Sequence, residues 1–388
     1  MAQQTTGGSN TALLTGPGAA NGAISTTADR RALYLKLFSG ELFKGFQHNT
    51  IARDLVMKRT LKNGKSLQFI YTGRTTAEYH TPGNSILGNS DSAPPVAEKT
   101  ITCDDLLISS AFVYELDETL AHYDLRGEIS KKIGYALAEK YDRKIFQAIT
   151  KAARKASPIT KTNYVEPGGT QVRVGTTTNG SDAYSATALV NAFYDAAAAL
   201  DEKGVSTEGR VGVLNPRQYY ELIQQVGENG LVNRDEQGTS RQKGNGIVEI
   251  AGIKIYKSMN IPFFGRYGTK FGTGSATNPG VTDPGNKGDF VEVEMVDETA
   301  GSGAVKTVNN YGNGTSDFEN SCGLIFGREA AGVVEAIGPQ VQVTSGDVSV
   351  IYQGDVILGR MAMGADYLNP AAAVELFAGT ATKPAAFG

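Results

Sequence analysis

The stretch from Tyr123 to Ala153 constrains the fold most strongly, because it predicts one long uninterrupted helix. It contains no proline, and apolar residues fall on every fourth position: Leu125, Ile129, Ile133, Leu137, Tyr141, Ile145, Ile149 and Ala153. Four residues advance a helix by about 400°, so this stripe drifts by about 40° at each step. A helix of this length would run about 45 Å. We therefore expect its two ends to pack against different neighbours.

Charged residues fill the remaining arcs of this helix: Lys131, Lys132, Glu139, Arg143 and Lys144. A core helix of an ordinary enzyme remains an alternative interpretation of the pattern taken alone. The pattern of this helix alone does not distinguish the two interpretations.

Composition narrows the class of protein. The chain has 388 residues, enough for two or three hydrophobic cores, and its net charge of −3 gives no basic field for nucleic acid. The cysteines, Cys103 and Cys322, lie far apart without a CxxC pair, which suits a reducing cytoplasm and suggests neither a disulfide framework nor a zinc site. No apolar run approaches the ~20 residues of a membrane span, and the N-terminus carries no basic-then-apolar signal, so we expect no membrane partner.

The first part of the chain predicts extended, outward-reaching segments. Residues 1–28 are small, polar and glycine-rich, which is typical of a flexible arm, and a short amphipathic helix follows from Arg30 to about Phe46. Val56 to Tyr71 predicts a β-hairpin, because two β-prone runs flank Asn63-Gly64. A long turn-rich stretch and a returning strand from Lys99 to Asp105 extend it into a protrusion. We expect this protrusion to dock on another subunit, although a disordered insertion would look similar.

The second part predicts an α/β lobe. A strand at Arg210–Leu214 precedes a helix at Arg217–Val226, and a strand pair at Ile247–Tyr256 bends at Gly252. Gly265–Phe318 is rich in loop formers. Further predicted elements are the helix Ala186–Leu200 and the strands Ser110–Leu116, Thr170–Val174, Asp289–Val296, Ser321–Ile337, Gln340–Val343, Val348–Met363 and Ala371–Phe377.

The sequence contains no complete phosphate-loop, nucleophile or paired metal-site motif. Gly64-Lys65-Ser66 ends like a phosphate loop, but the position that needs the first glycine is Arg59, and the flanks predict strand–turn–strand. No GxSxG nucleophile motif occurs. The histidines are too scattered for a paired metal site: His48, His80 and His122. We therefore expect no enzyme activity, no cofactor and no metal.

Several stretches, taken in order, resemble one protein family. They are NGKSLQF (Asn63–Phe69), GRTTAEYHTPG (Gly73–Gly83), EKTIT with DDLL (Glu98–Leu107), HYDLR (His122–Arg126) and RMAMGADYLNPAAAVELF (Arg360–Phe377). Their sequence is similar to that of the major capsid proteins of short-tailed, T-seven-type bacteriophages. The likeness covers about residues 30–150 and continues, more weakly, near the end. No single motif is diagnostic, and the joint order carries the resemblance.

The resemblance implies an α+β fold of the Hong Kong 97 capsid type, with an N-terminal arm, an extended β-hairpin loop, a peripheral domain with a long spine helix, and an axial α/β domain. The expected boundaries are 1–50 for the arm with its short helix; 51–110 for the extended loop; 111–184 and 318–362 for the peripheral domain with spine helix 123–153; and 185–317 and 363–388 for the axial domain with insertion 265–317.

The function implied by the resemblance is structural. The chain would self-assemble as hexamers and pentamers into the icosahedral head of a podovirus, formed in the bacterial cytoplasm. A scaffolding protein and a portal are implied partners, and the shell would enclose double-stranded DNA without sequence-specific contacts. Two alternatives stay open: an encapsulin-like nanocompartment, marked by cargo enzymes and a shell without DNA, and an unrelated α/β enzyme with a convergent polar pocket.

Candidate inter-subunit contacts follow from the predicted hairpin and arm: Lys62, Asn63, Gly64, Lys65, Arg74, Glu78, Tyr79, Arg30 and Arg31. In some members of the fold a lysine of the extended loop forms an isopeptide bond with a neighbour's asparagine, and Lys62 and Lys65 are the positional candidates. Such a bond needs a buried, deprotonated lysine beside an acid, so we expect intersubunit ion pairs there and at Arg74 and Glu78 instead. Arg30 and Arg31 would offset the charge of DNA phosphates.

Overall fold

The computed structural model describes residues 51–73, 79–83, 96–103, 106–114, 125–161, 164–176, 180–224, 249–261, 321–343, 353–378 and 383. The predicted arm, the predicted helix at 30–46 and the Gly265–Phe318 stretch with its strand lie outside these residues. The chain divides into two compact units. The smaller unit includes Asp105–Ala138 and Ile337–Ala362, and the larger unit comprises His48–Asp104, Glu139–Ala336 and Met363–Gly388. No helix among the described residues is long and apolar enough to cross a membrane.

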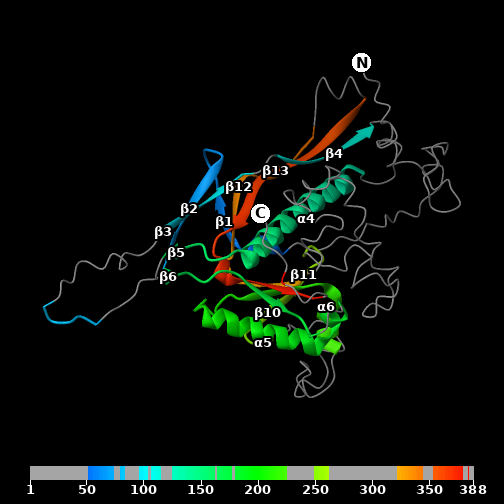
Figure 1. Ribbon diagram of the computed structural model, residues 1–388. Helices are drawn as coiled ribbons and strands as arrows, with labels where there is room; N and C mark the ends of the chain where they lie inside the picture. Colours follow the sequence, from blue (N-terminus) through cyan, green and yellow to red (C-terminus); the bar gives the residue numbers. More distant parts are fainter. Residues whose placement is uncertain are drawn as a thin grey trace. The chain divides into compact units, whose positions relative to one another are not determined.

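Helix α4 (Leu125–Arg154) confirms the predicted long helix (Figure 1). The stripe is buried in both units, at Ile129, Ile133, Leu137, Tyr141, Ile145, Ile149 and Ala153. Among the charged residues beside the stripe, Lys131 and Lys132 are exposed. Arg143 and Lys144 are buried, because the larger unit encloses every residue from Tyr141 to Thr150. A buried guanidinium needs a compensating charge, and Arg143 Nη2 lies 3.2 Å from Glu139 Oε1.

The smaller unit packs strands against the first half of α4. Strand β4 (Leu107–Tyr114) pairs antiparallel with β13 (Gly354–Tyr367) between Gly354 and Met361, and β12 (Ala331–Val343) lies beside β13. Gly359 lies so close to Ile133 and Leu137 that a side chain there would overlap them. The helix therefore covers this face of the strands.

The larger unit is built on a six-stranded mixed sheet with the order β7-β14-β11-β8-β10-β9. The strands are β7 (Thr170–Arg173), β14 (Ala373–Phe377), β11 (Ser321–Phe326), β8 (Val211–Leu214), β10 (Ile253–Lys257) and β9 (Glu249–Ile250). Strands β8, β11 and β14 are buried along their whole length. Such strands are covered on both faces, and Figure 1 shows α5 along one face and the end of α4 on the other.

Local signals explain the helices beside this sheet. Ser185 accepts a hydrogen bond from Ala188 N at the start of α5 (Ala186–Glu202), and Gly204 follows its end with φ of 69°. Asn215 caps α6 (Pro216–Gln224), which starts at proline as predicted. The smaller elements are α2 (Ala52–Leu55), β5 (Thr160–Lys161), β6 (Tyr164–Val165), η1 (Gly180–Tyr184) and η7 (Pro370–Ala372).

The predicted hairpin across Asn63-Gly64 is wrong in its pairing. Strand β1 (Met57–Thr60) pairs in parallel with β12 over four residues, whereas β2 (Ser66–Thr72) pairs antiparallel with β3 (Val96–Thr102) over seven. Gly64 does adopt the positive φ of 95° that a turn requires. The longer pairing also sets Leu67 opposite Ile101, and we attribute the choice of partner to such apolar pairs, which a local turn signal does not supply.

Candidate inter-subunit contact site

Strands β2 and β3 form a two-stranded ribbon, here called the β2–β3 ribbon, in the larger unit (Figure 1). Successive side chains of a strand point to opposite faces, so the ribbon has an inner and an outer face. The inner face consists of Leu67, Phe69, Tyr71, Ala97, Lys99 and Ile101, all buried or half-buried. The outer face consists of Ser66, Gln68, Ile70, Thr72, Val96, Glu98, Thr100 and Thr102, all exposed.

The inner face is anchored at one end by apolar packing. Leu61, Ile101 and Val334 form a buried cluster, against which Leu67, Phe69 and Leu368 pack. The backbones come close here, because a side chain at Gly364 would overlap the carbonyl oxygen of Thr102. We call this end the ribbon root.

Polar contacts hold the inner face further along. Lys99 Nζ lies 2.8 Å from Asp366 Oδ2 and 3.7 Å from the centre of the Tyr367 ring. Beyond it, the Tyr71 hydroxyl donates to Glu166 Oε2 at 3.4 Å. The contacts therefore change from apolar to polar along the ribbon.

Two buried carboxylates hold the chain that leads into the ribbon. Glu335 Oε2 lies 2.9 Å from Lys58 Nζ, Oε1 accepts from the Tyr141 hydroxyl at 2.6 Å, and Arg53 contacts both oxygens at 3.2 and 3.3 Å. Burial alone would raise the pKa of Glu335, but hydrogen bonds from Tyr141, Lys58 and Arg53 outweigh it and hold that pKa below its usual range. Burial, with the hydrogen bond to Glu335, raises the pKa of Tyr141.

The second carboxylate, Asp142, accepts hydrogen bonds from the backbone N–H groups of Ile51 at 2.9 Å and Ala52 at 3.2 Å, and from Asn260 Nδ2 at 3.4 Å. Burial raises the pKa of Asp142 to about 6, although these three hydrogen bonds oppose the shift. Helix α2, which has no side-chain cap of its own, thus takes its cap from α4.

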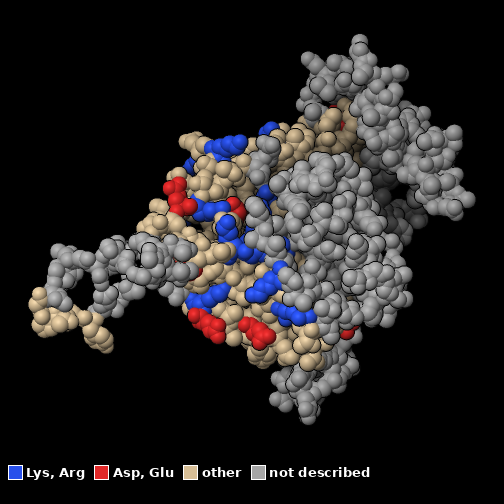
Figure 2. All heavy atoms as spheres, in the orientation of Figure 1, with Lys and Arg blue, Asp and Glu red and all other residues tan. Residues whose placement is uncertain are grey.

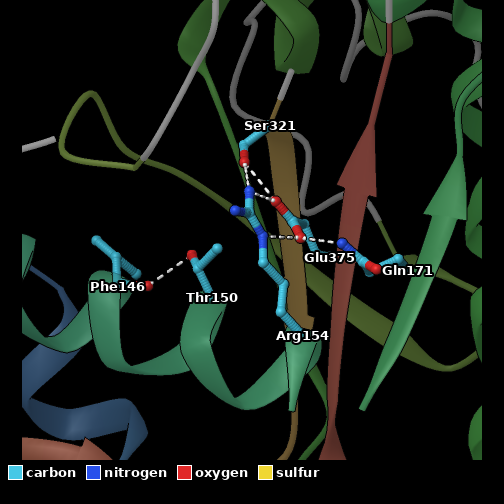
Figure 3. Close-up of polar contacts among 6 residues, drawn as sticks. All are labelled: Phe146, Thr150, Arg154, Gln171, Ser321 and Glu375. Atoms are coloured by element: carbon cyan, nitrogen blue, oxygen red, sulfur yellow. Dashed lines mark hydrogen bonds and ion pairs between the residues drawn. The ribbon is translucent and has the colours of Figure 1, made fainter. Parts of the chain in front are cut away.

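A third polar cluster lies at the end of α4 (Figure 3). Arg154 donates from Nε to Glu375 Oε2 at 2.7 Å and from Nη2 to Oε1 at 2.6 Å, while Gln171 Nε2 donates to Oε2 at 3.0 Å. Ser321 accepts from Arg154 Nη2 at 3.1 Å and donates to Glu375. Each carboxylate oxygen is occupied by protein donors, which indicates a structural role rather than acid–base chemistry.

The neighbouring Cys322 is fully buried, and burial, together with nearby Glu375, raises the pKa of its thiol. A thiol held neutral is a poor nucleophile. Within the part of the chain that the structure describes, no group of three or more His, Cys, Asp or Glu side chains could hold a metal ion.

The predicted contact residues fall into two groups. Lys62, Asn63, Gly64 and Lys65 lie together, exposed, in the turn between β1 and β2, and Tyr79 is also exposed. The others lie outside the described residues: Arg74, Glu78, Arg30 and Arg31. For all of them, contact with another subunit stays a prediction.

Sequence reasoning missed the residues that hold the ribbon to its own subunit, above all Lys99, Asp366 and Tyr367. One signal was available: the alternation of Val96–Thr102 places Lys99 on the same face as Ala97 and Ile101. A lysine on an apolar face indicates a partner. Its partner, more than 250 residues away in the sequence, could not be named.

Figure 2 shows Lys and Arg side chains gathered on the middle of the visible face. Among the basic side chains near the ribbon, Arg53 and Lys58 pair with Glu335, and Lys99 pairs with Asp366. Each of these three cations thus has a carboxylate partner. The outer face of the ribbon is instead partly apolar, and Glu98 is its one charged side chain.

Comparison with known proteins finds a matching protein family and a relative of similar length. The family description "Gp10A-like: Major capsid protein" matches residues 68–310. The chain is 26% identical over 361 residues to the major capsid protein of Escherichia phage T7, covering 90% of this chain and 93% of that protein.

Solved phage shells show the same architecture. The capsid structure of cyanophage P-SCSP1u is 29% identical with a TM-score of 0.66, and the match covers 93% of this chain and 97% of the other. The mature capsid of bacteriophage PhiM1 is 15% identical with a TM-score of 0.61, covering 95% and 96%. The predicted α+β fold of the Hong Kong 97 type is thereby confirmed, while the naming of its spine helix and axial domain stays a prediction.

Proposed function

This chain belongs to the Gp10A-like family of major capsid proteins, and we propose that the β2–β3 ribbon is the arm with which each subunit holds its neighbour in the shell. The chain is a major capsid protein of a tailed phage, and its copies assemble into the icosahedral capsid of the virion. Its family is one of structural proteins rather than enzymes. Its likeness to phage capsids favours this function over an encapsulin compartment.

The finer assembly belongs to the same proposal. Subunits form hexamers and pentamers in the host cytoplasm, with a scaffolding protein and a portal as partners, and the shell encloses double-stranded DNA. The net charge of −3 supports a shell that encloses DNA without gripping it. The division into arm, extended loop, peripheral domain and axial domain is part of this proposal too.

One observation carries the docking role. Ile70 is 74% exposed and Val96 is 63% exposed, and both lie on the outer face of the ribbon as diagonal neighbours across its strands. Large apolar side chains that lie exposed together mark interaction sites more often than scattered ones do. A neighbouring subunit covering this face would bury them.

The experiment replaces both Ile70 and Val96 with threonine, a polar residue that also favours β-strands. In the variant Ile70→Thr/Val96→Thr we expect a folded subunit whose yield of shells, counted by negative-stain microscopy and sedimentation, falls at least about tenfold, because a small loss at each contact multiplies over the shell.

The matched control is Tyr194→Gln, which removes an exposed aromatic residue from α5 in the same unit. It should leave the shell yield unchanged. Normal shells from the Ile70→Thr/Val96→Thr variant would refute the docking role of the ribbon.

The DNA content of purified virions tests the enclosed cargo. Particles isolated from infected cells should contain nuclease-protected double-stranded DNA. Shells that hold only protein cargo would support the encapsulin alternative instead.

A further inference from the structure

The contact between Lys99 and the end of β13 joins two parts of the chain that are far apart in sequence. Asp366, Tyr367 and Leu368 are consecutive, and each meets the inner face of the ribbon. Asp366 pairs with Lys99, Tyr367 lies against the Lys99 ammonium, and Leu368 packs into the ribbon root.

A backbone hydrogen bond orients the Asp366 carboxylate toward Lys99. The Tyr367 backbone N–H donates to Asp366 Oδ1 at 2.9 Å, which leaves Oδ2 for Lys99 Nζ at 2.8 Å. The ammonium also lies 3.7 Å from the centre of the Tyr367 ring, within the range of a cation–π contact. Lys155 Nζ lies 6.0 Å from the same ring centre. Two independent attractions therefore fix the position of one side chain.

The strength of the contacts differs along the ribbon. The root is packed by apolar side chains with Ile101 at 1% exposure, whereas the Lys99 and Asp366 side chains are 26% and 29% exposed. A partly exposed ion pair contributes little to global stability but still restricts local motion. Lys99 thus lies where the contacts of the ribbon change from buried apolar packing to a partly exposed ion pair.

We propose that Lys99 is a positioning residue that fixes the direction in which the β2–β3 ribbon leaves its own subunit, so that the outer face is presented to a neighbour in one orientation. The presentation of the outer face to a neighbour rests on the proposed function. The direction of the ribbon concerns the single subunit alone and is tested on unassembled subunits.

The test measures the ribbon in unassembled full-length subunits. Spin labels are attached at Thr72→Cys, at the exposed end of β2, and at Glu202→Cys, at the exposed end of α5; the native Cys103 and Cys322 are buried. In Lys99→Met we expect the distribution of label-to-label distances to widen about twofold, with a melting temperature within about 2 °C of the parent.

Two variants make the test specific to the cation. Lys99→Arg keeps the charge for both Asp366 and the Tyr367 ring and should retain the narrow distribution. Glu98→Gln changes the neighbouring charge on the outer face and should also retain it.

A narrow distribution in Lys99→Met, or a wide one in Lys99→Arg, would overturn the proposal. Shell yield is measured on the same variants to separate the two hypotheses. A wide distribution with normal shells would support Lys99 as the positioning residue and count against the docking role of the ribbon.

Discussion

At the scale of single residues, the ion pair between Arg154 and Glu375 shows how the larger unit tolerates buried charge. The Arg154 side chain is 1% exposed and that of Glu375 is 0% exposed. Removing one partner leaves the other charge without compensation in a medium of low polarity. We expect Glu375→Gln to lower the free energy of unfolding by about 3–5 kcal/mol, measured by chemical denaturation.

The control for this pair is Asp201→Asn. Asp201 pairs with the buried Arg210 at 2.7 Å, but its own side chain is 60% exposed. Water screens the Asp201 carboxylate, and Arg210 keeps its hydrogen bonds to the backbone oxygens of Val205 and Ser206, so the loss should stay below about 1 kcal/mol. Equal losses in the two variants would show that burial does not set the strength of the Arg154–Glu375 pair.

Asp142 makes the stability of the larger unit depend on pH. Its pKa is about 6 in the folded chain, against an ordinary value of 3.8, because burial disfavours its charge. Between pH 3.8 and about 6 the folded state keeps a proton that the unfolded chain has lost, so stability falls as pH rises through this window. The full cost, of the order of 3 kcal/mol, is present at pH 7.

Asp142→Asn removes this titration. The difference in unfolding free energy between parent and variant should change with pH between 4 and 6 and become constant above pH 7, measured by denaturation at each pH. A difference that does not vary across this window would contradict a raised pKa.

At the scale of elements, helix α4 and the ribbon differ in how far the sequence could predict them. The helix was predicted at Tyr123–Ala153 and occurs at Leu125–Arg154, because its pattern repeats within a few residues. The partner of β2 was not predicted, because Asn63-Gly64 reports only on the local turn and β3 lies beyond a long intervening stretch. The same limit applies to Lys99 and Asp366, whose contact depends on the completed fold.

Gly134 offers a test of α4 itself. It lies inside the helix, and a side chain there would meet nothing within 4 Å. Because glycine loses more backbone entropy than alanine in a helix, Gly134→Ala should raise the free energy of unfolding by about 0.5–1 kcal/mol in a denaturation experiment.

The contrasting variant is Gly359→Ala on β13, where the added carbon would overlap Ile133 and lie 2.9 Å from Leu137 Cδ1. This substitution should destabilise the protein by about 1–3 kcal/mol. A stabilising effect there would show that α4 does not press on the strands.

At the scale of the whole molecule, three elements run from one compact unit into the other: α4, β12 and β13. The segment that leads into the ribbon is held by Glu335 on β12 and Asp142 on α4, and the ribbon itself by Asp366 on β13. Each of these three long elements therefore carries a contact to the β2–β3 ribbon or to the segment that leads into it. The proposed docking of the ribbon on a neighbour would need the ribbon in a defined position.

Covalent linkage between subunits gives the last prediction. An isopeptide bond at Lys62 or Lys65 would need a lysine deprotonated by burial beside an acid, and both lysines are exposed in the turn between β1 and β2. Shells boiled in detergent should therefore migrate as single chains of 41.0 kDa on a denaturing gel. A ladder of multimers that disappears in the variant Lys62→Arg/Lys65→Arg would show instead that assembly buries and activates these lysines, and a ladder that persists would place a crosslink elsewhere in the chain.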